Sequence, residues 1–306
     1  MTPHAAQLER ICAQVPMLAT SERRITPIAG GMTNHNYRVI TEAGDCVVRI
    51  AVDESGELGI DRDNEHRNSI SAAQAGVGAP IIARVTEPEA LVVGFVDGVT
   101  LTPSDFRDPR RVTALATALR RLHTAQPFAR DFDMAFVQER YHEIVIANGY
   151  PLPADYAAYA DRARRMSAAL ARARVHTAPC HNDLMPGNFI EPDGPGSPLW
   201  IVDYEYSGNN DPGYDLGDAI NELELDTGQA EQLVSEYFGS PAPQELARAR
   251  LWSLMSQWGW SLWGSIRIGT TGDPEIEAWA VAMWSRAVAQ FESPEFNELV
   301  ARVEAS

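Results

Sequence analysis

The segment that most constrains the fold of this 306-residue chain is His181-Asn-Asp-Leu-Met-Pro-Gly-Asn188, followed by Ile201-Val-Asp203-Tyr-Glu. Between them, the turn-rich residues 191–198 separate two short runs of strand-forming residues. This arrangement predicts a β-hairpin with strands over 188–190 and 199–203. The hairpin would bring Asn188 and Asp203 together in space although fifteen positions separate them in the sequence.

Three side chains of this segment suit the transfer of a phosphoryl group. Asp183 can orient and deprotonate a hydroxyl, and Asn188 and Asp203 can each place an oxygen on Mg²⁺ that bridges nucleotide phosphates. The five-residue step from Asp183 to Asn188 is also the spacing of the protein-kinase catalytic loop, where these two roles are divided in the same way. We predict that Asp183, Asn188 and Asp203 are catalytic, and that the last two are metal ligands.

The composition limits the partners of the chain. A formal net charge of −17 argues against a general nucleic-acid binder, which needs a positive surface. No run of residues approaches the ~18 uninterrupted apolar positions of a membrane span. The three cysteines fit neither a metal-ligand spacing nor a disulfide framework. We expect a cytoplasmic protein that acts on a small molecule, with no nucleic-acid or membrane partner, and we leave open a homodimer.

The pattern along the chain indicates two lobes. The first hundred residues predict mostly strands, and the later part predicts mostly helices, beginning with the apolar stripe Leu115, Leu119 and Leu122 at i, i+4 and i+7. We place the boundary near Val96, so that residues 1–96 form one lobe and 97–306 the other, with the chemistry in the cleft between them. The predicted strands of the first lobe are 25–29, 36–40, 46–51 and 91–96, and its predicted helix is 61–74.

A glycine pair lies between the first two predicted strands, in Gly30-Gly31-Met-Thr33-Asn34. Glycine lets the backbone approach phosphate oxygens and offers amide donors, although such a pair is also typical of a plain turn. We assign Gly30, Gly31, Thr33 and Asn34 to the nucleotide site, together with Phe95 at the end of the strand 91–96.

Arg49 interrupts an otherwise apolar strand, in which alternation places it on a defined face. Burial of a guanidinium is costly without an anion. Arg49 therefore grips a nucleotide phosphate, pairs with Glu65 of the following helix, or extends to water at a strand edge. A pair with Glu65 would reproduce the cation–carboxylate pair that positions phosphates in kinases, with Arg in place of the usual Lys. We assign both residues to the nucleotide site.

Taken together, these motifs resemble the choline/ethanolamine kinase family, within the wider group of kinase-like phosphotransferases that includes aminoglycoside kinases. The resemblance extends over roughly residues 28 to 268 in family order. It implies an α+β fold of the bilobal protein-kinase type, with a small β-rich N-lobe and a larger, mainly helical C-lobe. It also implies ATP and Mg²⁺ as cofactors and a small alcohol as acceptor. Further motifs that carry it are Glu205-Tyr-x-Gly208, Gly213-Tyr-Asp215-Leu-Gly217 and Val47-Val-Arg49-Ile.

The same resemblance implies roles for individual residues. Asp183 is the base, Asn188 and Asp203 hold the metal, and Arg49 with Glu65 contacts the nucleotide. Three further positions have weaker assignments. Asp215 is expected to brace the catalytic loop by hydrogen bonds, His181 to fix backbone through its ring nitrogens, and Glu205 either to support the site or to contact substrate.

The acceptor prediction depends on tryptophan, because six of the seven tryptophans follow residue 250. In a helix over 251–268, Trp258 falls on an apolar stripe with Leu251, Met255 and Leu262, and we assign it to the core. Trp260 and Trp263 lie off that stripe, in a segment that resembles the aromatic helix of the choline site. We assign these two to the acceptor, because a quaternary ammonium binds the negative faces of aromatic rings.

Other functions stay open at this stage. Ethanolamine would prefer hydrogen-bond acceptors to rings, thiamine carries an aromatic cation, and an aminoglycoside needs several carboxylates on an open surface. A catalytically inactive binding module is a different class of function, and the presence of Asp183, Asn188 and Asp203 argues against it. Choline is the acceptor we predict.

Overall fold

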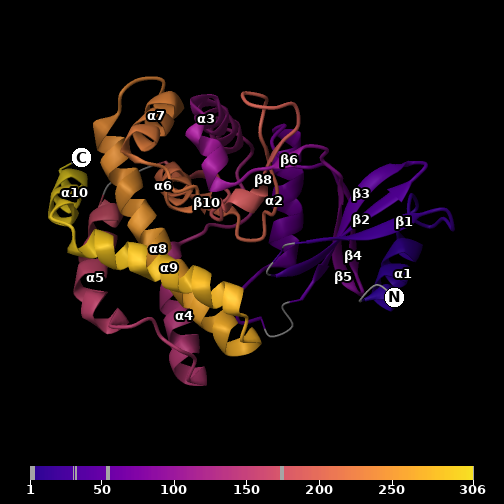
Figure 1. Ribbon diagram of the computed structural model, residues 1–306, viewed down its shortest axis with the longest axis horizontal. Helices are drawn as coiled ribbons and strands as arrows, with labels where there is room; N and C mark the ends of the chain where they lie inside the picture. The colour runs from indigo at the N-terminus through magenta and orange to yellow at the C-terminus, as the bar shows by residue number, and fades with distance from the viewer. Residues whose placement is uncertain (1–3, 30, 32, 53–55, 173–175, 306) are drawn as a thin grey trace.

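The N-terminal lobe is built on one antiparallel sheet. The computed structural model describes residues 4–29, 31, 33–52, 56–172 and 176–305 (Figure 1). The five strands of the sheet run in the spatial order β1-β2-β3-β5-β4. They are β1 (Arg24–Ile28), β2 (Asn34–Thr41), β3 (Gly44–Ala51), β4 (Ile81–Thr86) and β5 (Glu89–Gly94). The strands predicted at 25–29, 36–40, 46–51 and 91–96 are confirmed, with ends shifted by up to two residues, whereas the edge strand β4 was not predicted.

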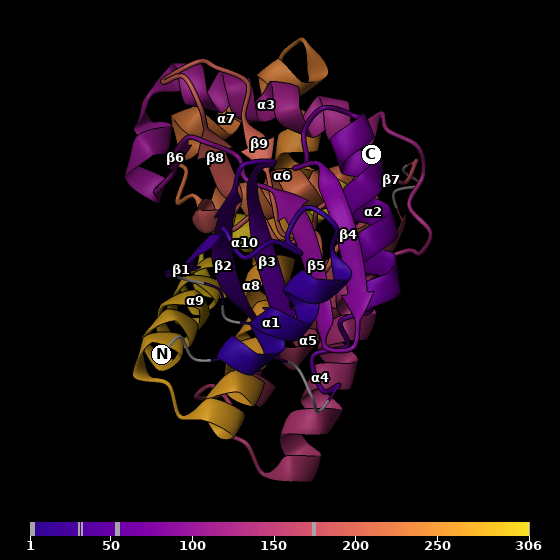
Figure 2. The same cartoon turned by 90° about the vertical axis from the view of Figure 1, so that its right-hand side faces the viewer.

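The two faces of β3 have different neighbours, as its alternation predicts. Cys46, Val48 and Ile50 are buried in a core shared with helix α1 (Ala5–Gln14), which crosses one face of the sheet (Figure 2). Val47 and Arg49 point to the other side and line a cavity. Helix α1 was not among the predicted elements.

Helix α2 (Arg62–Gln74) follows β3 and is fastened to the C-terminal lobe. Asn64 and Asn68 donate from their side-chain amides to the carbonyl of Ser207, at 2.9 and 3.1 Å. Just before the helix, Leu58 is buried in the C-terminal core, and Tyr141 donates to its carbonyl at 2.8 Å. These contacts fix α2, and with it Glu65, relative to the catalytic residues.

The C-terminal lobe is mainly helical and contains two small sheets (Figure 1). Strand β6 pairs with the hairpin β8–β9, and β7 pairs with β10. The proposed boundary at residue 96 falls in the short connection between β5 and β6. The strands are β6 (Val99–Thr100), β7 (Ala178–Cys180), β8 (Phe189–Glu191), β9 (Trp200–Ile201) and β10 (Gly208–Asn210). The helices are α3 (Pro109–His123), α4 (Met134–Asn148), α5 (Ala160–Arg172), α6 (Pro212–Glu222), α7 (Thr227–Phe238), α8 (Pro243–Thr271), α9 (Pro274–Glu292) and α10 (Glu295–Glu304), with 3₁₀ turns at Pro103–Arg107, Tyr156–Tyr159 and Pro186–Asn188.

The long helix α8 is central to the C-terminal core. The predicted stripe Leu251, Met255, Trp258 and Leu262 is buried throughout, so this part of the sequence interpretation is confirmed. Helix α6 packs directly on α8. At Gly217 of α6 an added Cβ would lie only 2.3 Å from the carbonyl oxygen of Ala249, so the close approach of the two helices requires glycine there.

Candidate active site

A cavity of about 410 Å³ lies between the sheet of the N-terminal lobe and the catalytic segment of the C-terminal lobe. Its lining has a polar part, an apolar part and an aromatic part. Three of its acidic side chains are Asp183, Asp203 and Glu205, and it also includes Asn188 and Arg49. An apolar part is formed by Val47, Ala79, Ile81, Val93, Ile190 and Val202, and an aromatic part by Tyr206, Trp260, Trp263 and Trp279.

Helix α6 holds the backbone of the catalytic loop. The carboxylate of Asp215 accepts hydrogen bonds from the amides of His181 and Asn182, both at 2.8 Å. His181 in turn places its Nδ1 3.3 Å from the amide of Asp183 and its Nε2 3.0 Å from the carbonyl of Val202. The bracing contacts predicted for Asp215 and His181 are therefore present. Asn182 adopts φ +66°, which the surrounding bonds stabilise.

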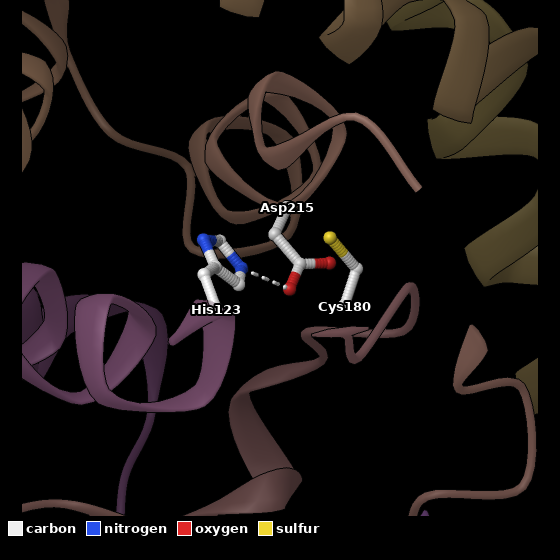
Figure 3. Close-up of side chains that lie close together, drawn as sticks. All are labelled: His123, Cys180 and Asp215. Carbon is white, nitrogen blue, oxygen red and sulfur yellow. Dashed lines mark hydrogen bonds and ion pairs between the residues drawn. The ribbon is translucent and has the colours of Figure 1, made fainter. Parts of the chain in front are cut away.

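Asp215 also belongs to a buried group with His123 and Cys180 (Figure 3). The ring Nε2 of His123 lies 3.0 Å from Asp215 Oδ2, and its Nδ1 lies 2.8 Å from the Tyr237 hydroxyl. Burial raises the pKa of Cys180 well above its ordinary value, so the thiol keeps its proton and is a poor metal ligand. This group lies next to the catalytic loop, and the carboxylate of Asp215 already accepts hydrogen bonds from the backbone of that loop.

The predicted hairpin brings Asn188 and Asp203 to the same place. Strands β8 and β9 pair with Phe189 opposite Ile201, and Val202 donates to the carbonyl of Asn188 at 2.9 Å. Asp203 follows with φ +74°, a left-handed conformation that Asp tolerates better than most residues. The side-chain amide of Asn188 donates to the carbonyl of Asp183 at 2.9 Å, which orients its oxygen as the atom available to a cation.

Asp183 is half-buried on the cavity wall. Burial, together with the negative charges of Asp218 and Asp203, raises its pKa well above the ordinary value. A carboxylate in such a position has increased affinity for a proton. This is a property that suits a group that accepts one from a substrate hydroxyl.

Arg49 lies within a group of carboxylates. Its guanidinium contacts Asp203 and lies 3.4 Å from Glu65, so the predicted pair with Glu65 is present. Burial disfavours the charge, but Asp203 and Glu65 outweigh that effect and raise the pKa of Arg49. Arg62 adds a second positive charge, with contacts to Glu65 at 2.8 Å and to Glu205 at 3.2 Å.

The turn between β1 and β2 contacts this group through side chains. Thr33 Oγ1 and Asn34 Nδ2 donate to the two oxygens of Glu205, at 2.6 and 2.9 Å. Gly31 and Phe95 line the cavity, whereas Gly30 lies outside the described residues. An added Cβ on Gly31, at φ +94°, would be 2.8 Å from the carbonyl oxygen of Asn34, so this turn also depends on glycine.

The tryptophans of α8 divide as their helical phase predicts. Trp258 stacks on Tyr156 at 3.8 Å between ring centroids and contacts Trp284 in the core. Trp260 and Trp263 are buried in the same core and also line the cavity. The indole of Trp263 donates to the Tyr206 hydroxyl at 2.9 Å.

Among the cavity residues that were not assigned to the site from the sequence are Tyr206 and Trp279. Tyr206 lies in the recognised segment after Asp203, and Trp279 belongs to the tryptophan-rich C-terminal region, so both had a sequence signal. Glu222 lies in the acidic stretch 221–226, for which the sequence allows two interpretations: carboxylates that supply charge to a cation, or an exposed helix face. In the structure it is buried, and burial raises its pKa to about 8.

The chemistry of the donor set fits a divalent cation such as Mg²⁺. Such cations prefer hard oxygen ligands, and Asn188 and Asp203 offer an amide and a carboxylate oxygen on neighbouring backbone segments. Glu65, Asp203 and Glu205 also have carboxylate oxygens within 4.8 Å of one another. One oxygen of Asp203 is already in contact with Arg49, so a metal at that oxygen would compete with the guanidinium.

Residues 24–252 match the model of the phosphotransferase enzyme family. This chain belongs to that family. Among solved structures, this phosphotransferase is similar to a choline/ethanolamine kinase family protein from Mesorhizobium loti, with 30% identity, a TM-score of 0.86, and coverage of 99% of this chain and 100% of the other. The family predicted from the motifs and the kinase-like α+β fold are confirmed.

Curated relatives of this phosphotransferase include both choline- and ethanolamine-related proteins. Protein LicA of Haemophilus influenzae is 27% identical over 68% of this chain and 61% of its own length. Ethanolamine kinase 2 of mouse is 28% identical over 63% of this chain and 51% of its own length. The matched region is therefore about half to three fifths of these relatives. In the described part of this phosphotransferase, none of the helices has the length and apolar character needed to cross a membrane.

Proposed function

We propose that this chain is an ATP-dependent kinase that transfers the γ-phosphoryl group to the hydroxyl of choline and forms phosphocholine. One observation carries the proposal: a single cavity contains Asp183 together with the rings of Tyr206, Trp260 and Trp263. The trimethylammonium group donates no hydrogen bond and is held by ring faces and carboxylates. An aromatic compartment beside a carboxylate base suits that substrate.

The residues of the cavity support the following division of roles. Asp183 orients the hydroxyl and accepts its proton. Arg49, held by Glu65, contacts the nucleotide phosphates and offsets charge on them. Asn188 and Asp203 would hold Mg²⁺, which when bound neutralises phosphate oxygens and orients them for in-line transfer. These assignments are part of the proposal.

The nucleotide is proposed to lie against the sheet of the N-terminal lobe. Val47, Ala79 and Val93 offer a flat apolar surface for a base, and Gly31 offers close approach of backbone to phosphate. A related LicA structure contains AMP, whereas aminoglycoside 2′-phosphotransferase-IIIa, which shares the fold, was solved with GDP. ATP and GTP should therefore be compared directly, and we expect ATP to be preferred.

Ethanolamine is the second candidate acceptor, because the cavity also contains the buried carboxylate of Glu222. A primary ammonium would donate hydrogen bonds to such a group. Choline remains the first choice, because the aromatic surface is larger than a primary ammonium needs.

The test is ADP release with choline, ethanolamine, thiamine and an aminoglycoside side by side, with Mg²⁺ and ATP. We expect kcat/KM for choline to exceed that for ethanolamine by about tenfold, the discrimination that one or two kcal/mol provides. A reversed order would replace choline by ethanolamine. No turnover with any acceptor, together with nucleotide binding, would indicate an inactive binding module.

The setting of the protein is also proposed. Cys12, Cys46 and Cys180 are free and buried, which supports a reducing cytoplasm. A homodimer stays a prediction that sedimentation of the purified protein would test.

A further inference from the structure

Helix α6 presents three carboxylates on one face. Asp215, Asp218 and Glu222 are spaced at i, i+3 and i+7, which places them in a row. The first braces the start of the catalytic loop, and the last lines the cavity. Asp218 lies between them and is completely buried, and it is not part of the cavity lining.

Asp218 accepts two short hydrogen bonds from different parts of the lobe. Its Oδ2 accepts from the backbone amide of Leu184, the residue directly after Asp183, at 2.6 Å. Its Oδ1 accepts from the hydroxyl of Ser256 in helix α8, also at 2.6 Å. With this bond, four consecutive amides of the catalytic loop, 181–184, have side-chain acceptors.

Ser256 precedes Trp260, a cavity residue, by about one turn of helix α8. Ser256, Trp260 and Trp263 recur at i, i+4 and i+7, so they share one face of the helix. The close approach of α6 and α8 at Gly217 brings the neighbouring Asp218 within reach of that face. The carboxylate of Asp218 therefore joins the catalytic loop to the helix that carries the aromatic wall.

We infer that Asp218 is a positioning residue that sets the catalytic loop, and with it Asp183, at a fixed place relative to the acceptor wall of α8. This inference rests on the proposed kinase function, because Asp183 is the base of that proposed reaction. A carboxylate is suited to this role, because charge-assisted hydrogen bonds are shorter and stronger than neutral ones.

The burial of Asp218 supports the inference. Desolvation raises the pKa of Asp218 to about 7, so keeping the charge inside the lobe is unfavourable for stability. Replacement of buried charges by well-packed apolar groups is often neutral or stabilising. If Asp218 served packing alone, an apolar residue at this position would make the fold more stable. An apolar residue could not accept the hydrogen bonds from Leu184 and Ser256.

Activity measurements on four variants test the link. Asp218→Ala should lower kcat about 100-fold, the scale of a 1 Å misplacement, while KM for ATP stays within about twofold. Asp218→Asn should restore most of that loss, because its oxygen can accept from Leu184 while Ser256 rotates to accept from its amide. Ser256→Ala should lower kcat about fivefold, as expected for one hydrogen bond. The matched surface change Asp161→Ala, at a side chain that is 85% exposed, should leave kcat unchanged.

A double variant and hydrogen exchange complete the test. Asp218→Ala combined with Ser256→Ala should be no slower than Asp218→Ala alone, since both act through one carboxylate. Amides 181–184 should exchange faster with solvent in both single variants, and this readout needs no acceptor. Fully multiplicative losses, or unchanged exchange in folded Ser256→Ala, would overturn the inference.

Two other results would also test the inference. If Asp218→Ala does not fold, kcat and the exchange of amides 181–184 in Ser256→Ala decide whether the inference holds. If the natural chain phosphorylates none of the acceptors, the proposed function fails, whereas the exchange comparison still decides whether Asp218 holds the loop.

Discussion

Two groups of carboxylates border the catalytic segment, and they differ in their counter-charges. Glu65, Asp203 and Glu205 are in contact with Arg49 and Arg62. The second group is Asp183, Asp218 and Glu222, and in the described part of the chain none of its members takes part in an ion pair with arginine or lysine. The carboxylates of the first group are therefore paired with guanidinium groups, whereas those of the second group, among the residues described, are not.

The difference indicates which substrate each group suits. Arginines beside the first group can turn to phosphate oxygens when a nucleotide enters. In the second group no described carboxyl forms a salt bridge with arginine, and Asp183 and Glu222 line the cavity with the aromatic rings, so a positively charged acceptor would favour their ionised form. Desolvation by burial raises the pKa values of Asp218 and Glu222 to about 7 and about 8, although hydrogen bonds from Ser256 and Leu184 lower the first and the charge of Arg286 lowers the second.

The largest expected effect is at Asp183, the member of the second group that would touch the acceptor hydroxyl. Asp183→Asn should lower kcat about 1,000-fold, because the amide cannot accept the proton. Nucleotide affinity, measured by calorimetry, should change little. Asp193→Asn, in the exposed hairpin turn, serves as control. Near-normal turnover of Asp183→Asn would remove the base assignment.

Arg49 tests the first group. Arg49→Gln should lower kcat/KM for ATP about 100-fold through lost phosphate contacts. The same change should strengthen binding of Mn²⁺ alone, followed by electron paramagnetic resonance, since Asp203 is released from the guanidinium.

The control for Arg49 is Arg84→Gln, another arginine of the same sheet that pairs with Asp63 and Glu89. It should change neither quantity. If Arg49→Gln weakens Mn²⁺ binding, then the arginine supports the metal site and does not compete with it.

Glu222 is expected to affect the binding of the acceptor and not the binding of ATP. Glu222→Gln should raise KM for choline about tenfold, as loss of one cation–carboxylate contact predicts, with KM for ATP unchanged. A sharper measure is the preference for choline over its neutral isostere 3,3-dimethyl-1-butanol, which should fall by a similar factor.

Glu231→Gln provides the matched control for Glu222, because Glu231 is exposed on helix α7. An equal rise in KM for choline and for ATP in Glu222→Gln would indicate a structural role, and would leave the second group without a function in cation binding.

The contrast between the two groups was only partly predictable from the sequence. Local motifs were sufficient to predict that Asn188 and Asp203 lie together, because a turn between two short strands fixes their approach. Helical phase was sufficient to separate Trp258, which stacks on Tyr156, from Trp260 and Trp263, which line the cavity. In each case the deciding information lies within one or two adjacent elements.

Information from distant elements was not accessible in the same way. Glu222 is buried and Glu224 is exposed because helix α6 ends at Glu222 and Glu224 adopts φ +51°, so helical phase cannot be extended across them. Asp218 acquires its partners only when α6 packs on α8. Thr33 and Asn34 were assigned to phosphate from their place beside glycine, yet their side chains bond to Glu205, which lies more than 170 positions away. Their role toward the nucleotide stays a prediction.

The smallest expected effect is the pH dependence of stability that the second group produces. Since Asp218 and Glu222 have pKa values raised to about 7 and about 8 in the folded state, the folded chain binds protons more tightly than the unfolded chain. Their contribution to stability is therefore greatest below the ordinary carboxyl pKa and is lost as the pH rises through 7 and 8. The melting temperature should fall by about 5 °C between pH 5 and pH 9, and Glu222→Gln should flatten this dependence while Glu231→Gln leaves it unchanged. A melting temperature that rises over this range, or a slope that Glu222→Gln does not alter, would mean that burial does not raise the pKa values of these two carboxyl groups.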